Sequence, residues 1–176
     1  MKNEAEFKSE FKRSVRRYKG FSLSLAAPMI SGIPDLFVVM PGYMPILLEA
    51  KWLGEIKRNK FNRKIPYKPL QLLWIQECHN VNPYTAMGLI GCIYQDKIHA
   101  ILVAYGTPQF YQLSNCFLTD CAYSTISAET KVFDVQHMFS KVPIPRLERA
   151  KILVHTTAGS YLDFNDPPRS KDPLAF

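Results

Sequence analysis

The order of helix and strand signals in this chain predicts an α/β fold, in which one mixed sheet carries helices on its faces. A helical repeat of apolar residues comes first, and strand-like apolar runs follow it. A second helical segment is then followed by two more strand-like runs. With 176 residues, 47% of them hydrophobic, the chain is long enough to build this fold as one compact domain.

The first helix is predicted over about residues 4 to 18 from the spacing of its apolar side chains. Such residues recur there at intervals of three and four, at Phe7, Phe11, Val15 and Tyr18. This spacing places them on one face of a helix, which we expect to pack against the sheet.

Three strands are expected after this helix, and the last two form a hairpin. The first covers residues 21 to 26, and the other two are the apolar runs at residues 36–40 and 46–48. Residues 41 to 45, Pro-Gly-Tyr-Met-Pro, are typical of a turn. If the hairpin is symmetric about Gly42, residues whose numbers sum to 84 face each other.

This register brings three ionisable residues together at the open end of the hairpin. Asp35 would lie directly across from Glu49, and Lys51, two residues further along, would project from the same face as Glu49. Buried charges cost free energy unless they are paired or bind a metal. We therefore expect these residues to form a functional site.

The residue types favour metal-assisted hydrolysis of a phosphodiester bond. Carboxylate oxygens suit Mg²⁺, for which Mn²⁺ can substitute, so Asp35 and Glu49 are the candidate metal ligands. Lys51 would orient or deprotonate the attacking water, or donate to the developing oxyanion. Taken singly, an Asp after Pro is often a turn residue and Glu-x-Lys is often a solvated ion pair. Their matching register within apolar strands favours the functional interpretation.

Residues 32–35, Gly-Ile-Pro-Asp, followed by residues 49–51, Glu-Ala-Lys, resemble the signature of the PD-(D/E)XK nuclease superfamily. The nearest branch is the group of VRR-NUC and Holliday-junction-resolvase-like nucleases. Residues 68–74, Lys-Pro-Leu-Gln-Leu-Leu-Trp, resemble the segment that opens the next core helix in VRR-NUC proteins. The resemblance covers about residues 4 to 104 and implies a restriction-endonuclease-like αβββαβ core.

The resemblance also implies a metal-binding Glu on the N-terminal helix. At about 100° per residue, Glu4 falls within roughly 40° of the apolar face, whereas Glu10 lies near its edge. Related proteins place this Glu three residues before the first core hydrophobe, which matches Glu4 and Phe7. Glu4 is the predicted ligand and Glu10 the alternative, although Glu4 could simply complement the helix dipole.

Gln71 lies in the first turn of the helix predicted over residues 69 to 80, which has Pro69 near its favoured first position. The predicted core stripe of this helix consists of Leu70, Leu73 and Trp74, with Ile75 alongside. From the residues alone, Gln71 would be an exposed polar neighbour of that stripe. The resemblance instead implies a catalytic role, in which Gln71 holds a water or the hydration shell of the metal.

Positive charge is concentrated in the first helix and in the polar loop after Lys51, and the net charge of the chain is +7. This distribution favours an acidic partner. Beside a metal site, we expect such residues to bind DNA phosphates, with Phe61 and Tyr67 available to stack or pack. The candidates are Arg16, Arg17, Lys57, Arg58, Lys60, Arg63, Lys64 and Lys68.

The rest of the chain is expected to extend the same domain. We place the nuclease core at residues 1–106 and a C-terminal extension, packed on it, at residues 107–162. The extension is predicted to contain a strand near residues 109–118 and a helix near residues 129–140. Residues 163–176 are expected to form an extended or disordered tail.

The sequence also predicts an environment for the protein. No apolar run reaches the 18 or more residues that a membrane span needs, so no membrane partner is expected. The cysteines lack the paired spacing of a metal site and are expected to be free thiols of a reducing compartment, at Cys78, Cys92, Cys116 and Cys121. We expect a cytoplasmic location in a prokaryote, or in the host cytoplasm for a viral protein such as one from a phage.

Together these features predict a Mg²⁺-dependent endonuclease that hydrolyses DNA. The resemblance implies branched, flapped or junction DNA as the substrate. It also implies a possible homodimer, because two symmetric incisions need two active sites. The alternatives are a sequence-specific restriction-like nuclease, a DNA-binding or assembly module with a relic site, and an enzyme that cleaves RNA.

Overall fold

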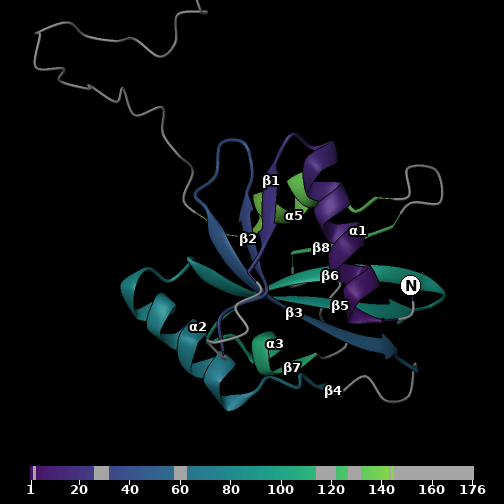
Figure 1. Cartoon of the computed structure of the whole chain (residues 1–176). Helices are drawn as coiled ribbons and strands as arrows, with labels where there is room; N and C mark the ends of the chain where they lie inside the picture. The colour runs from purple at the N-terminus through teal and green to yellow at the C-terminus, as the bar shows by residue number, and fades with distance from the viewer. Residues whose placement is uncertain are drawn as a thin grey trace, which may run out of the picture. The chain divides into compact units, whose positions relative to one another are not determined.

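A six-stranded mixed sheet forms the centre of the fold, with its strands in the order β1-β2-β3-β5-β6-β8 (Figure 1). The computed structural model describes residues 1, 3–25, 32–57, 63–113, 122–126, 132–142 and 144. The elements are α1 (Glu4–Arg17), β1 (Phe21–Ser24), β2 (Leu36–Val39), β3 (Ile46–Glu55), β4 (Arg63–Lys64), α2 (Pro69–Val81), β5 (Ala86–Tyr94), β6 (Lys97–Ala104), α3 (Pro108–Tyr111), β7 (Gln112–Leu113), β8 (Ala122–Thr125) and α5 (Val135–Lys141).

The sheet combines parallel and antiparallel pairs of strands. β3 and β5 run parallel, and the chain between them forms α2, as a crossover between parallel strands requires. The pairs β1–β2, β2–β3, β5–β6 and β6–β8 are antiparallel. The prediction of an α/β fold with a mixed sheet flanked by helices is therefore confirmed.

Apolar side chains pack on both faces of this sheet. On one face, α1 and α5 contribute buried residues such as Phe11 and Phe139. On the opposite face, α2 and α3 contribute Ile75 and Phe110, together with the small sheet formed by β4 and β7. Figure 1 shows α2 and α3 lying away from α1 and α5. The helices thus enclose the sheet from both sides.

The hairpin of β2 and β3 has the register that the sequence predicts. Leu36 pairs with Leu48, and Val38 pairs with Ile46. Gly42 lies in the turn with a φ of +81°, a value that glycine adopts readily. β3 continues to Glu55, well beyond the predicted end of the strand. Its pairing with β2 stops at Leu48, but its pairing with β5 extends to Glu55.

The prediction of the buried face of α2 is wrong. Leu70, Leu73 and Trp74 are 49%, 51% and 38% exposed, whereas Ile75 is fully buried. Leu72 lies on the buried side with Ile75 and packs against the same core cluster. Because apolar residues surround the first two turns of this helix, their spacing does not single out one face.

The C-terminal elements differ in part from those predicted. Residues 108 to 111 form α3 rather than a strand, since Pro108 at the first helical position favours a helix start. A short strand, β7, follows it, and residues 114–121 lie outside the described chain. The helix predicted near residues 129–140 appears as α5, whose N-cap Asp134 accepts a hydrogen bond from the His137 backbone N–H.

β8 is the edge strand of the sheet, and α5 packs on the sheet with the N-terminal helix. β8 pairs with β6, and the Ser14 hydroxyl of α1 accepts a hydrogen bond from the backbone N–H of Phe133, just before α5. The chain divides into a compact unit, Met1–Arg146, and a second unit, Leu147–Phe176. The second unit, including the predicted tail at residues 163–176, lies outside the described residues.

Two sequence expectations about the environment of the protein concern described residues. Cys78 and Cys92 are free thiols, as predicted, while Cys116 and Cys121 lie outside the described residues. Among the helices that the structure describes, none is long and apolar enough to cross a membrane.

The loop before β2 approaches the first turn of α2 closely at Gly32. Gly32 has a φ of +96°, and a Cβ atom at this position would lie 2.8 Å from the carbonyl oxygen of Leu70. A glycine is therefore required both by the backbone conformation and by the available space. This contact holds the loop that leads to Asp35 against the helix that carries Gln71.

We expect Gly32→Ala to destabilise the protein more than Gly42→Ala. Both substitutions place alanine at a positive φ, at a cost of about 1 kcal/mol. A Cβ at Gly42 meets nothing within 4 Å, so only Gly32→Ala also forces the loop away from α2, at about 1–3 kcal/mol more. Urea unfolding of both variants checks this, and equal losses would show that the close contact contributes nothing.

Candidate active site

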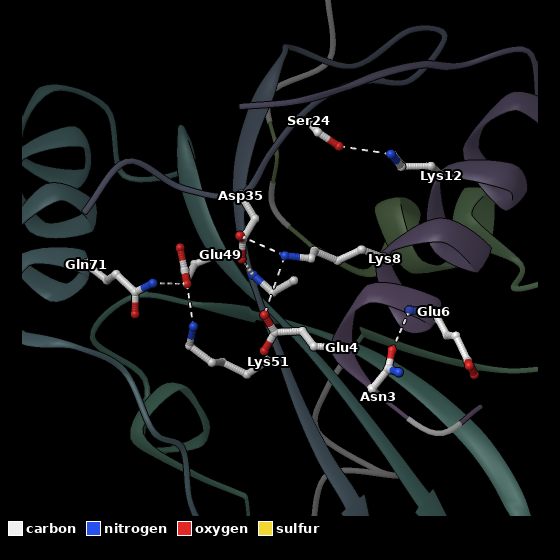
Figure 2. A network of polar contacts seen from close by, with 11 residues as sticks. Asn3, Glu4, Glu6, Lys8, Lys12, Ser24, Asp35, Glu49, Lys51 and Gln71 are labelled. Atoms are coloured by element: carbon white, nitrogen blue, oxygen red, sulfur yellow. Dashed lines mark hydrogen bonds and ion pairs between the residues drawn. The ribbon is translucent and has the colours of Figure 1, made fainter. Parts of the chain in front are cut away.

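The candidate site begins where the ladder between β2 and β3 ends. The last pair of that ladder joins Leu36 to Leu48, so Asp35 and Glu49 are the next residues along each strand. The Asp35 carboxylate accepts a hydrogen bond from the backbone N–H of Ala50 through Oδ2, at 3.0 Å. Beyond the last pair of the ladder, a side-chain hydrogen bond thus connects the two chain segments, and it fixes the Asp35 carboxylate beside β3 (Figure 2).

Glu49 is fully buried and occupies the centre of the site. Its Oε1 atom accepts hydrogen bonds from Lys51 Nζ and from Gln71 Nε2, each at 2.5 Å (Figure 2). Its Oε2 atom is also buried, and it has no hydrogen-bond partner among the residues that the structure describes. Among the described residues, the Oε1 atom of this buried carboxylate is therefore hydrogen-bonded and the Oε2 atom is not.

Burial raises the pKa of Glu49 to about 7. The hydrogen bond from Lys51 and its positive charge oppose this rise, whereas the charges of Asp35 and Glu4 add to it. The environment thus disfavours the charged form of Glu49 despite the adjacent ammonium group. A further positive charge near Oε2 would have the opposite effect.

Lys51 projects from the same side of β3 as Glu49, as predicted from strand alternation. Its side chain is only 9% exposed, and its Nζ atom lies 6.0 Å from the centre of the Tyr67 ring. The ammonium group carries three N–H donors, one of which is used by Glu49. Among the described residues, the Lys51 ammonium group thus has N–H donors left for a ligand.

The sequence predicts that Tyr67 either stacks on DNA or packs in the protein. In the structure it packs in the protein, near Lys51. Its ring stacks on Phe110 at 4.5 Å, and its hydroxyl group lies against Gly88, where a Cβ atom would collide with it. Gly88 is the β5 partner of Glu49, so the missing side chain makes room for the phenol beside the site. Burial, with the charge of Glu49, raises the pKa of Tyr67 above its usual value.

Gln71 is half-buried and binds Glu49, rather than being exposed as its residue pattern alone suggested. Its Oε1 atom accepts the backbone N–H of Lys68 at the start of α2, at 2.9 Å. Since the oxygen of the amide is engaged there, the nitrogen faces the site and donates to Glu49. The start of α2 is thereby connected to the buried carboxylate.

Lys8 also belongs to the site, although the sequence analysis did not select it. Its Nζ atom lies 3.0 Å from Asp35 Oδ1 and 3.5 Å from Glu4 Oε1 (Figure 2). Burial disfavours the charge of Lys8, but the hydrogen bonds and charges of Asp35 and Glu4 outweigh this effect and raise its pKa. The signal in the sequence is the spacing of Glu4 and Lys8, four residues apart on one helix, which is also common in surface ion pairs.

The two candidate glutamates of α1 lie in different surroundings. Glu4 joins the site through Lys8, and its charge acts on Glu49. Glu10 instead forms an ion pair with Arg13 at 2.5 Å. Of the two, the structure brings Glu4 and not Glu10 into the network around Asp35.

The carboxylates of the site fit a hard divalent cation that keeps much of its water. The described residues contain no group of three or more His, Cys, Asp or Glu side chains arranged as metal ligands. Mg²⁺, however, is usually bound through one or two carboxylates together with water molecules. Asp35 and Glu49 supply such a pair, and the uncompensated Oε2 atom of Glu49 is a suitable ligand.

The basic residues fall into two separate groups. Lys57 follows β3, Arg63 and Lys64 form β4, and Lys68 precedes α2; all of these are exposed. Arg16 and Arg17 are exposed at the far end of α1, about 18 Å along the helix from Glu4, as the rise of 1.5 Å per residue implies. In Figure 1, this end of α1 lies in the upper part of the coloured fold and β4 lies near its lower edge. Arg58, Lys60 and Phe61 lie outside the described residues.

Comparison with known proteins assigns no family to this chain. No protein-family model matches the sequence, and no curated protein does so. The fold and the geometry of this site are therefore the basis on which a function is proposed.

We expect the stability of the metal-free protein to fall as the pH rises from about 4.5 to about 7. In this window the folded protein holds a proton on Glu49 that the unfolded chain has already released, so the free energy of unfolding decreases with increasing pH. The loss that Glu49 causes is at most about 3 kcal/mol. Glu49→Gln removes this loss.

Urea unfolding in EDTA at several pH values checks this prediction. Glu55→Gln is the matched control, because Glu55 is an exposed carboxylate on the same strand. The difference in stability between Glu49→Gln and the wild type should grow in favour of the variant as the pH rises from about 4.5 to about 7, and should stay constant above that. Parallel pH profiles for all three proteins would show that Glu49 ionises normally.

Proposed function

We propose that this protein is a Mg²⁺-dependent endonuclease that hydrolyses phosphodiester bonds of DNA. The observation that carries the proposal is the buried Glu49 carboxylate, whose Oε2 atom has no partner among the described residues although Asp35 and Lys51 flank it. Leaving a carboxylate oxygen buried without compensation is costly. A site that binds a cation during its reaction cycle gives a reason for keeping it.

In this proposal the side chains divide the work of binding and of proton transfer. Asp35 and Glu49 hold the Mg²⁺ ion, which, when bound, lowers the pKa of a water molecule and offsets charge on the phosphate. Asp35 is oriented by the Ala50 N–H, and Glu49 is oriented by Gln71. Both carboxylates are thus fixed before any ligand arrives, which favours binding.

Lys51 supplies positive charge next to the reacting phosphate. Its contact with Glu49 Oε1 fixes Nζ in the site, and among the described residues it leaves two N–H donors for a water molecule or a phosphate oxygen. A donor held at this position stabilises negative charge that develops on the phosphate oxygens or on the attacking water. The low exposure of Lys51 strengthens this effect because little water screens it.

Two features support DNA as the substrate. The net charge of +7 favours a polyanionic partner. Exposed basic side chains also lie between β3, which carries Glu49 and Lys51, and α2, which carries Gln71: these are Lys57, Arg63, Lys64 and Lys68. The choice of branched, flapped or junction DNA rests on the resemblance to Holliday-junction-resolvase-like nucleases. So does the possible homodimer, for which the exposed apolar side chains Leu73 and Trp74 on α2 provide a candidate surface.

We expect the wild-type protein to cleave DNA in Mg²⁺ or Mn²⁺ and not in EDTA. Asp35→Asn, Glu49→Gln and Lys51→Gln should each reduce the rate by roughly a hundredfold or more, because each removes charge from the reacting centre. DNA binding should persist in these variants, since the exposed basic residues are unchanged. Glu55→Gln, on the same strand but exposed, is the matched control and should cleave normally.

The assay uses a panel of linear, flapped and four-way-junction DNA and a matched RNA, with gel analysis of the products. Paired symmetric cuts in the junction would indicate two sites acting together, as in a homodimer, whereas a sequence-dependent cut in linear DNA would favour a restriction-like enzyme. DNA binding without cleavage in either metal would contradict the proposal and favour a binding module with a relic site. Unchanged cleavage by a folded Asp35 or Glu49 variant would exclude that residue from the site.

A further inference from the structure

Lys8 places an ammonium group between two carboxylates of the candidate metal site. It contacts Asp35 Oδ1 at 3.0 Å and Glu4 Oε1 at 3.5 Å, while the other Asp35 oxygen is engaged by the Ala50 N–H. The Asp35 oxygen on which Lys8 lies is thus the one that the backbone leaves available for another ligand. A divalent cation that binds this oxygen would therefore meet the positive charge of the Lys8 ammonium group, which opposes its approach.

We propose that Lys8 is a resident counter-cation of the Glu4–Asp35 carboxylate pair, and that it must leave Asp35 before a divalent cation binds there. This inference rests on the proposed function, because it takes Asp35 as a ligand of the cation. Lys8, a residue outside the Asp-Glu-Lys signature, thereby has a role in metal exchange.

The charges of the site agree with such an exchange. Glu4, Asp35 and Glu49 carry up to three negative charges, and Lys8 and Lys51 carry two positive charges. When Lys8 withdraws, the remaining groups have a net charge of about −2, which one divalent cation neutralises. While Lys8 is in place, it reduces the repulsion between carboxylates that converge on the end of the hairpin.

The two lysines of the site differ in their freedom to move. The Lys51 side chain is 9% exposed and extends from the centre of the sheet, so its departure would leave Glu49 without a compensating charge. The Lys8 side chain is 26% exposed and is carried by α1, at the edge of the site. A long, partly exposed side chain can turn its ammonium group into water at little cost. Lys8 is thus the ammonium group that can be exchanged.

This exchange would raise the metal concentration at which the site fills. A cation that enters the site must displace Lys8 from Asp35, which weakens the apparent affinity for the metal. In the metal-free protein, Lys8 pairs with the Glu4 and Asp35 carboxylates and thereby stabilises the folded state. Substitution of Lys8 should therefore have opposite effects on metal affinity and on the stability of the metal-free protein.

Calorimetric titration with Mn²⁺ alone, without DNA, measures the first effect. Lys8→Gln should bind Mn²⁺ about three- to tenfold more tightly than the wild type. Lys12→Gln is the matched control: it removes an equal charge one turn further along α1, where the Lys12 ammonium contacts only the Ser24 hydroxyl at 2.9 Å among the contacts drawn in Figure 2. Lys8→Arg keeps the charge and presents its N–H donors in a planar fork that suits carboxylates, so its affinity should not exceed that of the wild type.

Thermal unfolding of the same variants measures the second effect. At pH 8 in EDTA, Lys8→Gln should unfold at a lower temperature than Lys12→Gln, and saturating Mn²⁺ should raise its Tm more than that of the wild type. Equal Mn²⁺ affinities for Lys8→Gln, Lys12→Gln and the wild type would overturn the role of Lys8 while leaving the metal site in place. Absence of Mn²⁺ binding in all of them, including the wild type, would overturn the exchange together with the proposed function.

Discussion

The burial of the Glu49 carboxylate is the constraint around which the candidate site is arranged. Glu49 lies on β3 just beyond the point where β2 stops pairing, with β5 on its other side. Its environment supplies two donors to Oε1 and none, among the described residues, to Oε2. The rise of its pKa to about 7 expresses the cost of this arrangement. Lys51 and Gln71 reduce that cost through their hydrogen bonds to Oε1, and the proposed metal would reduce it further.

Parts of the chain that are distant in sequence reach Glu49 through local features of each element. The Asp35 side chain, just before the start of β2, accepts the Ala50 N–H beyond the last β2–β3 pair. Gln71, in the N-terminal turn of α2, accepts the Lys68 N–H with its amide oxygen, and its amide nitrogen faces the site. Gly32 allows the loop before Asp35 to lie against that turn. Gly88, opposite Glu49 on β5, leaves space for the Tyr67 phenol under Lys51. These contacts share one result, which is a fixed carboxylate pair next to a fixed ammonium group.

The sequence predicted those parts of the site that depend on strand geometry. The hairpin register follows from a turn centred on Gly42, and the alternation of side chains then places Glu49 and Lys51 together. The buried face of α2 could not be predicted in this way, because apolar residues surround its first turns and only tertiary packing selects Ile75 over Leu73. The sequence did not identify Lys8 as a site residue, for a similar reason. Its spacing from Glu4 indicates a surface ion pair equally well until β2 brings Asp35 to the same place.

The central claim is that a divalent cation completes the coordination of the Asp35 and Glu49 carboxylates. Anomalous X-ray scattering from crystals of the whole chain soaked in Mn²⁺ tests it most directly. We expect an anomalous peak about 2 Å from Glu49 Oε2 and from one oxygen of Asp35, with Lys8 displaced from that carboxylate. A map at saturating Mn²⁺ without a peak between these two carboxylates, and with Lys8 still bound to Asp35, would contradict it.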